Sequence, residues 1–176
     1  MHRAKFPTAV GAAILLALLV HPRLFADDRD LKGTWAVVVT PNAISICNGP
    51  EIAPAPAPFH ELATYAGGGV LIETNTQLNF ISASLSPGFP FNASDGHGTW
   101  KRNDDDSGAK FSAKFRKFLY DATGHFIGNV DIVERISLDR DADTFSGKFT
   151  IQFTFLDNSP SLCSSGTLAA ERMTVP

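Results

Sequence analysis

The sequence predicts an all-β protein, a single eight-stranded antiparallel up-and-down barrel. Three observations lead to this prediction. Apolar and polar residues alternate over long stretches, turn-forming residues separate these stretches at hairpin spacing, and no stretch of the expected mature chain has a sustained helical period. Closure into a barrel is favoured because it removes the exposed edges that an open sheet would present.

The first 26 residues have the order of a secretory signal peptide. Arg3 and Lys5 precede an uncharged apolar run that ends at Val20, and a small residue stands just before the first two acidic residues. A run this short does not cross a bilayer as a resident helix. We expect residues 1–26 to be removed on export, to a secreted or periplasmic location, and residues 27–176 to form one domain without a membrane span. An uncleaved anchor is the alternative.

Eight strands are expected along the mature chain. The clearest is Phe145–Phe155, where Phe, Gly and Ile alternate with Ser, Lys, Thr and Gln. This period of two indicates one dry face and one wet face. The other expected strands are Gly33–Thr40, Phe59–Ala66, Val70–Glu73 continuing into Leu78–Ala83, Gly96–Arg102, Phe111–Tyr120, Phe126–Leu138 and Cys163–Arg172.

A segment rich in proline and alanine, residues 48–58, follows the first expected strand. Proline has no backbone N–H to donate to a ladder and favours extended backbone, so the segment is expected to be a long connection. A rigid crossover is one interpretation. A flap over the mouth of the barrel is the other, because long loops in small domains often act as lids.

The residue numbers themselves test closure of the barrel. Facing residues of an antiparallel pair have a constant sum of residue numbers, and the sums for Trp35 with Arg172 and for Cys47 with Cys163 differ by only a few positions. One register would therefore place a guanidinium on an indole at one end and two thiols together at the other. Pairing is the default for the two cysteines of an exported chain, so we predict a disulfide; two free buried thiols are the alternative.

The Gly33-Thr34-Trp35 sequence that opens the first strand, with Arg172 at the end of the last, resembles the signature of the calycin superfamily, the lipocalin-like and avidin-like barrels. The resemblance implies that Trp35 and Arg172 pack together to plug a closed end, and that the open end takes a small ligand. The chain is also similar to small secreted bacterial proteins with no assigned role.

Glu134 is the most suggestive residue for chemistry. It shares its strand phase with Ile132 and Ile136, so it points into the barrel if they do. A carboxyl group in an apolar interior must find a partner or rise in pKa, which is how enzymes obtain a general base near neutral pH. The alternative, which we favour at this point, is a β-bulge that turns Glu134 outward, or a structural ion pair.

Other kinds of site have little support in the sequence. The chain has 15 Lys and Arg against 18 Asp and Glu, a formal net charge of −3, so no excess of positive charge is available for a nucleic-acid partner. Cysteine and histidine do not recur at the spacing of metal ligands, and Asp139, Asp141 and Asp143 lack the glycine and glutamate of a calcium loop. No nucleotide-binding or nucleophile motif is present, and we expect neither metal nor cofactor.

The 14 phenylalanines either fill the barrel or line a pocket in it, since eight strands lie at the boundary between these outcomes. Our first hypothesis is a non-enzymatic binder of a small hydrophobic or aromatic molecule. The second is a cofactor-free isomerase or cyclase, as in barrels similar to allene oxide cyclase, with Glu134 handling the proton. A structural or interaction protein of the cell envelope is the third. The residues expected to contact a ligand are Tyr65, Trp100, Tyr120, Glu134, Phe149 and Phe153.

Overall fold

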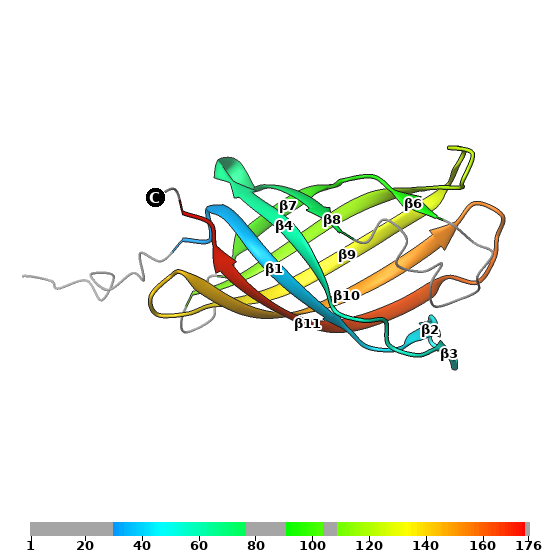
Figure 1. Ribbon diagram of the computed structural model, residues 1–176, viewed down its shortest axis with the longest axis horizontal. Coiled ribbons are helices and arrows are strands. Elements are labelled where there is room, and N and C mark those ends of the chain that lie inside the picture. Colours follow the sequence, from blue (N-terminus) through cyan, green and yellow to red (C-terminus); the bar gives the residue numbers. More distant parts are fainter. Residues whose placement is uncertain (1–29, 77–90, 104–108, 175–176) are drawn as a thin grey trace, which may run out of the picture.

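The computed structural model describes residues 30–76, 91–103 and 109–174 (Figure 1). The expected signal peptide and the expected extension at Leu78–Ala83 lie outside these residues.

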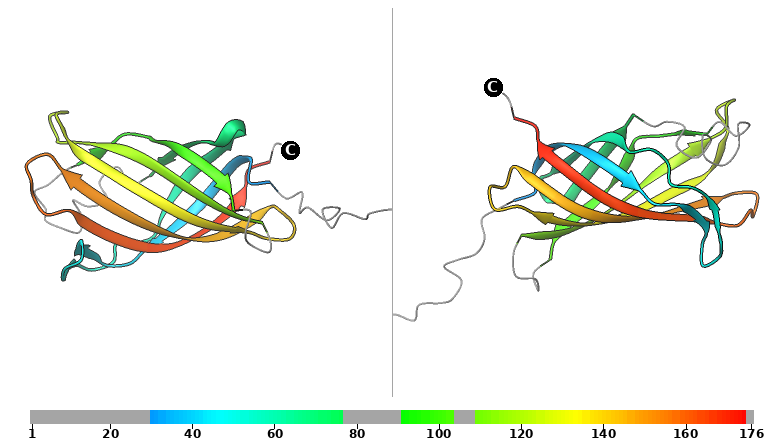
Figure 2. Two further views of the ribbon diagram at one scale, coloured as in Figure 1. Left: turned by 180° about the vertical axis from the view of Figure 1, so that it is seen from behind. Right: turned by 60° about the horizontal axis from the view of Figure 1, so that its bottom comes forward.

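Eight long strands form a closed antiparallel barrel, as the alternating pattern predicted. Each strand pairs with the next along the chain, and β1 pairs with β11 to close the sheet (Figures 1 and 2). The up-and-down topology is therefore confirmed. The barrel strands are β1 Gly33–Pro41, β4 Phe59–Ala66, β5 Val70–Asn75, β7 Gly96–Arg102, β8 Lys110–Tyr120, β9 Phe126–Leu138, β10 Thr144–Phe155 and β11 Leu162–Arg172.

Three short strands lie outside this ring. β2 (Ile44–Ile46) and β3 (Glu51–Ala53) form a hairpin that continues the sheet beyond the start of β11, and β6 (Asn92–Ala93) pairs with the end of β8. A single turn of 3-10 helix at Gly67–Gly69 joins β4 to β5. Within the segment rich in proline and alanine, Glu51–Ala53 form β3 and pair with β2, so the segment is not one continuous connection.

The register between β1 and β11 is the one that the residue numbers indicated. Trp35 faces Arg172 at one end of the pair and Pro41 faces Gly166 at the other. Beyond Pro41 the chain enters β2, and Cys47 forms a disulfide with Cys163. The predicted disulfide is confirmed, and it is a bond typical of proteins in oxidising compartments.

The alternation of apolar and polar residues along each strand decides which side chains fill the interior. Along β10, Phe145, Phe149 and Phe153 are buried, and the polar residues between them face outward. Large rings need small neighbours: a Cβ at Gly166 would lie 2.6 Å from the Phe149 ring, so only glycine fits opposite it on β11. The barrel wall therefore leaves room for aromatic side chains inside.

Candidate functional site

Aromatic rings fill the barrel at the end where β1 begins and β11 ends, which we call the closed end. Trp35 packs on Phe145 with ring centroids 4.9 Å apart, and Tyr65 contacts Phe145 edge-on at 6.4 Å. The Arg172 Cζ atom lies 4.2 Å from the centroid of the Trp35 ring. The Trp35 indole N–H donates to the backbone carbonyl of Leu31 at 2.9 Å. This packing plugs the closed end.

Arg172 also satisfies backbone carbonyls around the plug. Its Nη2 donates to the carbonyl of Asp30 at 2.9 Å and to that of Ala142 at 2.8 Å, and its Nη1 donates to the carbonyl of Lys32. One side chain thereby ties the segment before β1 and the β9–β10 turn to the end of β11. The planar guanidinium is suited to stacking and to several fixed hydrogen bonds at once.

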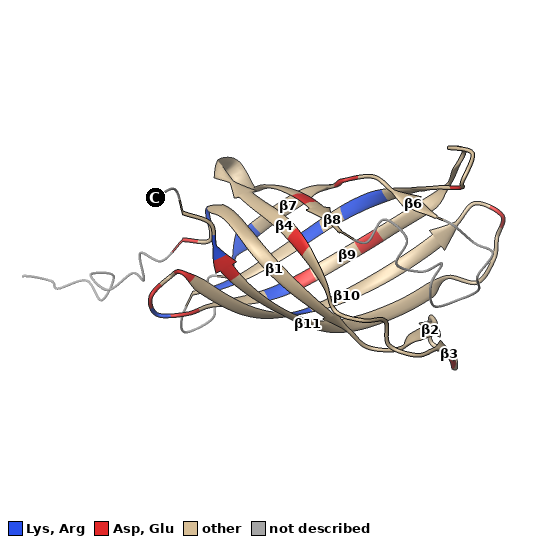
Figure 3. Ribbon diagram, in the orientation of Figure 1, with Lys and Arg blue, Asp and Glu red and all other residues tan. Residues whose placement is uncertain are grey.

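Charged residues lie midway along the barrel wall (Figure 3), and four of them are buried inside it. We call this group, together with Tyr65, the carboxylate layer. Its members are Glu61, Tyr65, Glu73, Lys117 and Glu134. Burying a charged group is costly unless it is paired and hydrogen-bonded, so each member needs a physical account.

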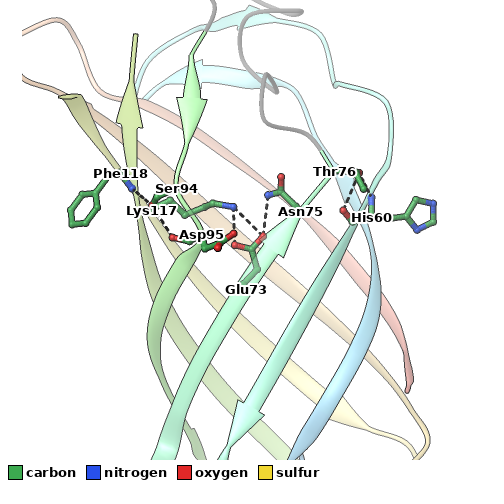
Figure 4. A network of polar contacts seen from close by, with 8 residues as sticks. All are labelled: His60, Glu73, Asn75, Thr76, Ser94, Asp95, Lys117 and Phe118. Atoms are coloured by element: carbon green, nitrogen blue, oxygen red, sulfur yellow. Dashed lines mark hydrogen bonds and ion pairs between the residues drawn. The ribbon is translucent and has the colours of Figure 1, made fainter. Parts of the chain in front are cut away.

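Glu73 on β5 and Lys117 on β8 form a buried ion pair inside the barrel (Figure 4). The Lys117 Nζ atom lies 2.8 Å from Glu73 Oε2 and 3.1 Å from Oε1, and the side-chain amide of Asn75 donates to Oε1 at 3.0 Å. The wall makes room for them, because a Cβ at Gly96 would lie 2.6 Å from both Glu73 Oε2 and the Phe115 ring. Both charges are therefore compensated locally.

Glu134 points into the barrel from the middle of β9 and is 2% exposed. The Tyr65 O–H on the opposite wall donates to Glu134 Oε2 at 2.9 Å. The interpretation that a bulge turns this residue outward is wrong, because the register between β9 and β10 is unbroken. The ion-pair alternative also fails, since the partner is a phenol. The only register shift between β8 and β9 is near Tyr120, far along the strand.

Burial raises the pKa of Glu134 to about 7; the Tyr65 hydrogen bond opposes the rise, and the charge of Glu73 adds to it. Burial likewise raises the pKa of the Tyr65 phenol well above its usual value, with the charge of Glu134 as the next cause. A carboxyl group with a pKa near neutrality can release and take up a proton under ordinary conditions. Of the two groups, Glu134 therefore has a pKa suited to proton transfer near neutral pH.

Glu61 is the one member that is not fully satisfied. It is 7% exposed, and its Oε1 is the only buried side-chain nitrogen or oxygen atom of the described residues that lacks a hydrogen-bond partner. Burial raises the pKa of Glu61 well above its usual range, and the charges of Glu134 and Glu73 raise it further. An unsatisfied buried acceptor lowers the free energy of unfolding by about 1–3 kcal/mol, so Glu61 destabilises the fold at this position.

Two adjoining cavities reach from the carboxylate layer toward the end opposite the plug, the open end. The inner cavity, about 50 Å³, is lined by Glu61, Glu73, Glu134, Lys117 and apolar side chains. The outer cavity, about 70 Å³, is almost wholly apolar. The two share lining residues, among them Phe59, Lys117 and Phe149, and therefore lie next to each other. The lining residues of the outer cavity include Phe59, Phe91, Leu119, Val130, Phe149 and Phe153.

Only some of the residues predicted to contact a ligand lie at the cavities. Phe149 and Phe153 line the outer cavity, Phe149 and Glu134 line the inner one, and Tyr65 lies beside Glu134. Trp100 lines neither cavity; its indole N–H donates to the carbonyl of Ala66 and its ring packs on Phe111.

Tyr120 also lines neither of these cavities. It ends β8 beside the register shift, and its ring contacts Phe126 with centroids 6.2 Å apart.

Glu61, Glu73 and Lys117 were not predicted as site residues, although the sequence carries a signal for each. Lys117 has the same strand phase as Phe115, and Glu61 has the same phase as Tyr65. Glu73 follows Leu71 by two residues on β5. A charged residue in phase with buried apolar neighbours points into the interior, and this rule would have identified all three.

Among the described residues, no group of three or more His, Cys, Asp and Glu side chains is arranged to hold a metal ion. Within the same part of the chain, no helix has the length and apolar character required to span a bilayer.

Comparison of the chain with protein-family models, with curated proteins and with solved structures found no match. The function of the chain must therefore be inferred from the geometry of the barrel interior.

Proposed function

We propose that this protein is an exported, calycin-like barrel that binds a small hydrophobic or aromatic molecule through its open end. The observation that carries the proposal is the apolar outer cavity, which leads inward to a layer of buried polar groups. Ligand sites are typically concave and mostly apolar, with a few convergent polar groups that orient the ligand. The plug of Trp35 and Arg172 at the other end matches the calycin-like arrangement.

The size of the two cavities indicates the size of the ligand. Their volumes, about 50 Å³ and about 70 Å³, together approach the roughly 150 Å³ of an engineered protein cavity that binds benzene. The proposed ligand therefore places about one ring inside the barrel.

Export is supported by two observations. The first 26 residues have the order of a signal peptide, and the disulfide between Cys47 and Cys163 is typical of an oxidising compartment.

Thermal unfolding with toluene as the probe tests the binding proposal. A ligand at 100 times its Kd adds about 2.7 kcal/mol of stability, which raises the Tm of a domain of this size by roughly 5–10 °C. Val130→Phe fills the outer cavity and should remove the shift, whereas Val38→Phe on the exposed face of β1 should preserve it. No shift in the unmodified protein, or an undiminished shift in Val130→Phe, would refute the proposal.

Proton-transfer catalysis is a second candidate, favoured specifically by the buried pair of Glu134 and Tyr65 at the inner cavity. A cofactor-free isomerase or cyclase would use Glu134 as the base. Exchange of methyl deuterium from deuterated acetophenone, followed by NMR, tests this candidate. We expect exchange above the buffer rate, abolished in Glu134→Gln and preserved in Glu171→Gln on the outer face of β11. Equal exchange by the Glu134→Gln protein would exclude it.

A further inference from the structure

The carboxylate layer has more acidic groups than basic ones. Glu61, Glu73 and Glu134 line the inner cavity with a single cation, Lys117, and the Lys117 ammonium contacts both carboxylate oxygens of Glu73. Glu134 receives its hydrogen bond from Tyr65. The layer therefore has an acidic group, Glu61, for which no cation of the layer remains.

The unsatisfied atom lies where a ligand would reach it. Glu61 lines the inner cavity from β4, and its Oε1 is buried without a donor. An apolar molecule in the outer cavity would direct any polar end toward this atom. An acceptor in such a position requires a group that donates hydrogen bonds.

The surrounding charges limit the nature of that group. The titratable side chains around the inner cavity are Glu61 and Tyr65 from β4, Glu73 from β5, Lys117 from β8 and Glu134 from β9. The remaining lining residues of β1, β10 and β11 are apolar. A carboxylate or phosphate would approach three carboxyl groups, whereas an ammonium group is a donor only and carries the missing positive charge.

We propose that the inner cavity is a subsite for the ammonium group of a small aromatic or apolar amine, with the Glu61 carboxylate as its main acceptor. This inference rests on the proposed binding function and specifies its ligand class. Because desolvation and its acidic neighbours favour protonated Glu61 in the empty barrel, binding of the cation expels a proton from the layer. Affinity for the amine therefore increases as the pH rises, and affinity for a neutral ring does not.

Calorimetric titration with benzylamine, benzyl alcohol, toluene and benzoate tests the inference. At pH 8 we expect benzylamine to bind at least about ten-fold more tightly than toluene, as a charge-assisted hydrogen bond implies, and benzoate to bind most weakly. Titration in two buffers of different ionisation enthalpy should show release of a proton with benzylamine only.

Glu61→Gln and Glu171→Gln provide the matched variants. Glu61→Gln should reduce the preference for benzylamine over toluene to about two-fold or less and abolish proton release, in a barrel that still binds toluene. Glu171→Gln removes an exposed carboxylate of β11 and should behave as the unmodified protein. Far-UV circular dichroism and the retained toluene binding establish that the Glu61→Gln barrel is folded.

The outcomes separate this inference from the function on which it rests. Toluene binding without a preference for benzylamine leaves the binding function standing and overturns the amine subsite. Benzyl alcohol binding as tightly as benzylamine overturns the cationic character of the ligand, and a preference that survives in Glu61→Gln overturns the role of Glu61. If none of the four probes binds, both proposals are wrong.

Discussion

The closed end and the middle of this barrel are made by the same strands, yet they differ in how fully their buried polar atoms are hydrogen-bonded. At the closed end, Arg172 is spread over an indole ring and three backbone carbonyls, and the Trp35 N–H has a carbonyl partner. In the carboxylate layer, Lys117 and Asn75 satisfy Glu73, and the Tyr65 phenol donates to Glu134. Glu61 Oε1 has no partner.

The difference divides the barrel interior into a part that stabilises the fold and a part that costs stability. The plug gains stability from aromatic burial and from fully satisfied polar groups. The carboxylate layer opposes folding through desolvated acids, a cost that natural proteins accept mainly at sites of binding or catalysis. The comparison predicts that substitutions in the plug destabilise the fold, whereas removing an unneeded charge from the layer stabilises it.

Trp35→Ala should cause the largest loss in the free energy of unfolding. Removing a fully buried indole from a packed core costs about 3–5 kcal/mol, and we expect the upper end because Arg172 also loses its aromatic partner. Urea unfolding measures it. A loss below about 1 kcal/mol would show that the plug is not the stable part of the interior.

Lys117→Met should cause the second-largest loss of unfolding free energy, about 4 kcal/mol, because it leaves Glu73 buried without its cation. The double variant Lys117→Met with Glu73→Gln should recover most of this loss, since no uncompensated charge remains. Arg116→Met is the matched control on the same strand: its bidentate pair with Asp131 is solvent-exposed, and its removal should hardly change the urea midpoint. Failure of the double variant to recover would contradict the account of the buried pair.

Glu134→Gln should change the pH dependence of stability. Because the folded state raises the pKa of Glu134 from 4.5 to about 7, the folded protein retains this proton, and its unfolding free energy falls as the pH rises through this interval. The shift corresponds to a change on the order of 3 kcal/mol. The variant should lose that part of the slope and be the more stable protein at pH 8. Identical slopes from pH 4 to pH 8 would rule this out.

Arg172→Lys should have the smallest effect of the four, about 1–2 kcal/mol. An ammonium keeps the charge but lacks the flat surface that lies on Trp35 and the several fixed donors that reach the carbonyls. Thermal unfolding measures the change. A lysine variant as stable as the original protein would indicate that charge alone holds the plug together.

The sequence predicted the barrel well because its information is local and periodic. Alternation within β10 fixes which face is buried, and the positions of Trp35, Arg172 and the two cysteines fix how the first and last strands align. Both kinds of inference use one strand, or one pair of strands, at a time.

The site was less predictable because it is assembled across the barrel. Lys117 meets Glu73 from a strand that is not its neighbour, and Tyr65 meets Glu134 from the opposite wall. Such meetings depend on the tilt and stagger of the whole sheet, which no single strand encodes. Tyr120 was expected in the pocket, but a register shift at the end of β8 accompanies its packing against Phe126.

The position of the first and last strands has a practical consequence. β1 begins and β11 ends at the plugged end of the molecule (Figure 1), where Arg172 holds the segment before β1 against the end of β11. A sensor chip or fluorescent fusion attached through the C-terminus would therefore leave the cavity mouth facing the solution. On the proposed binding function, immobilised protein should capture small molecules as well as the free protein does.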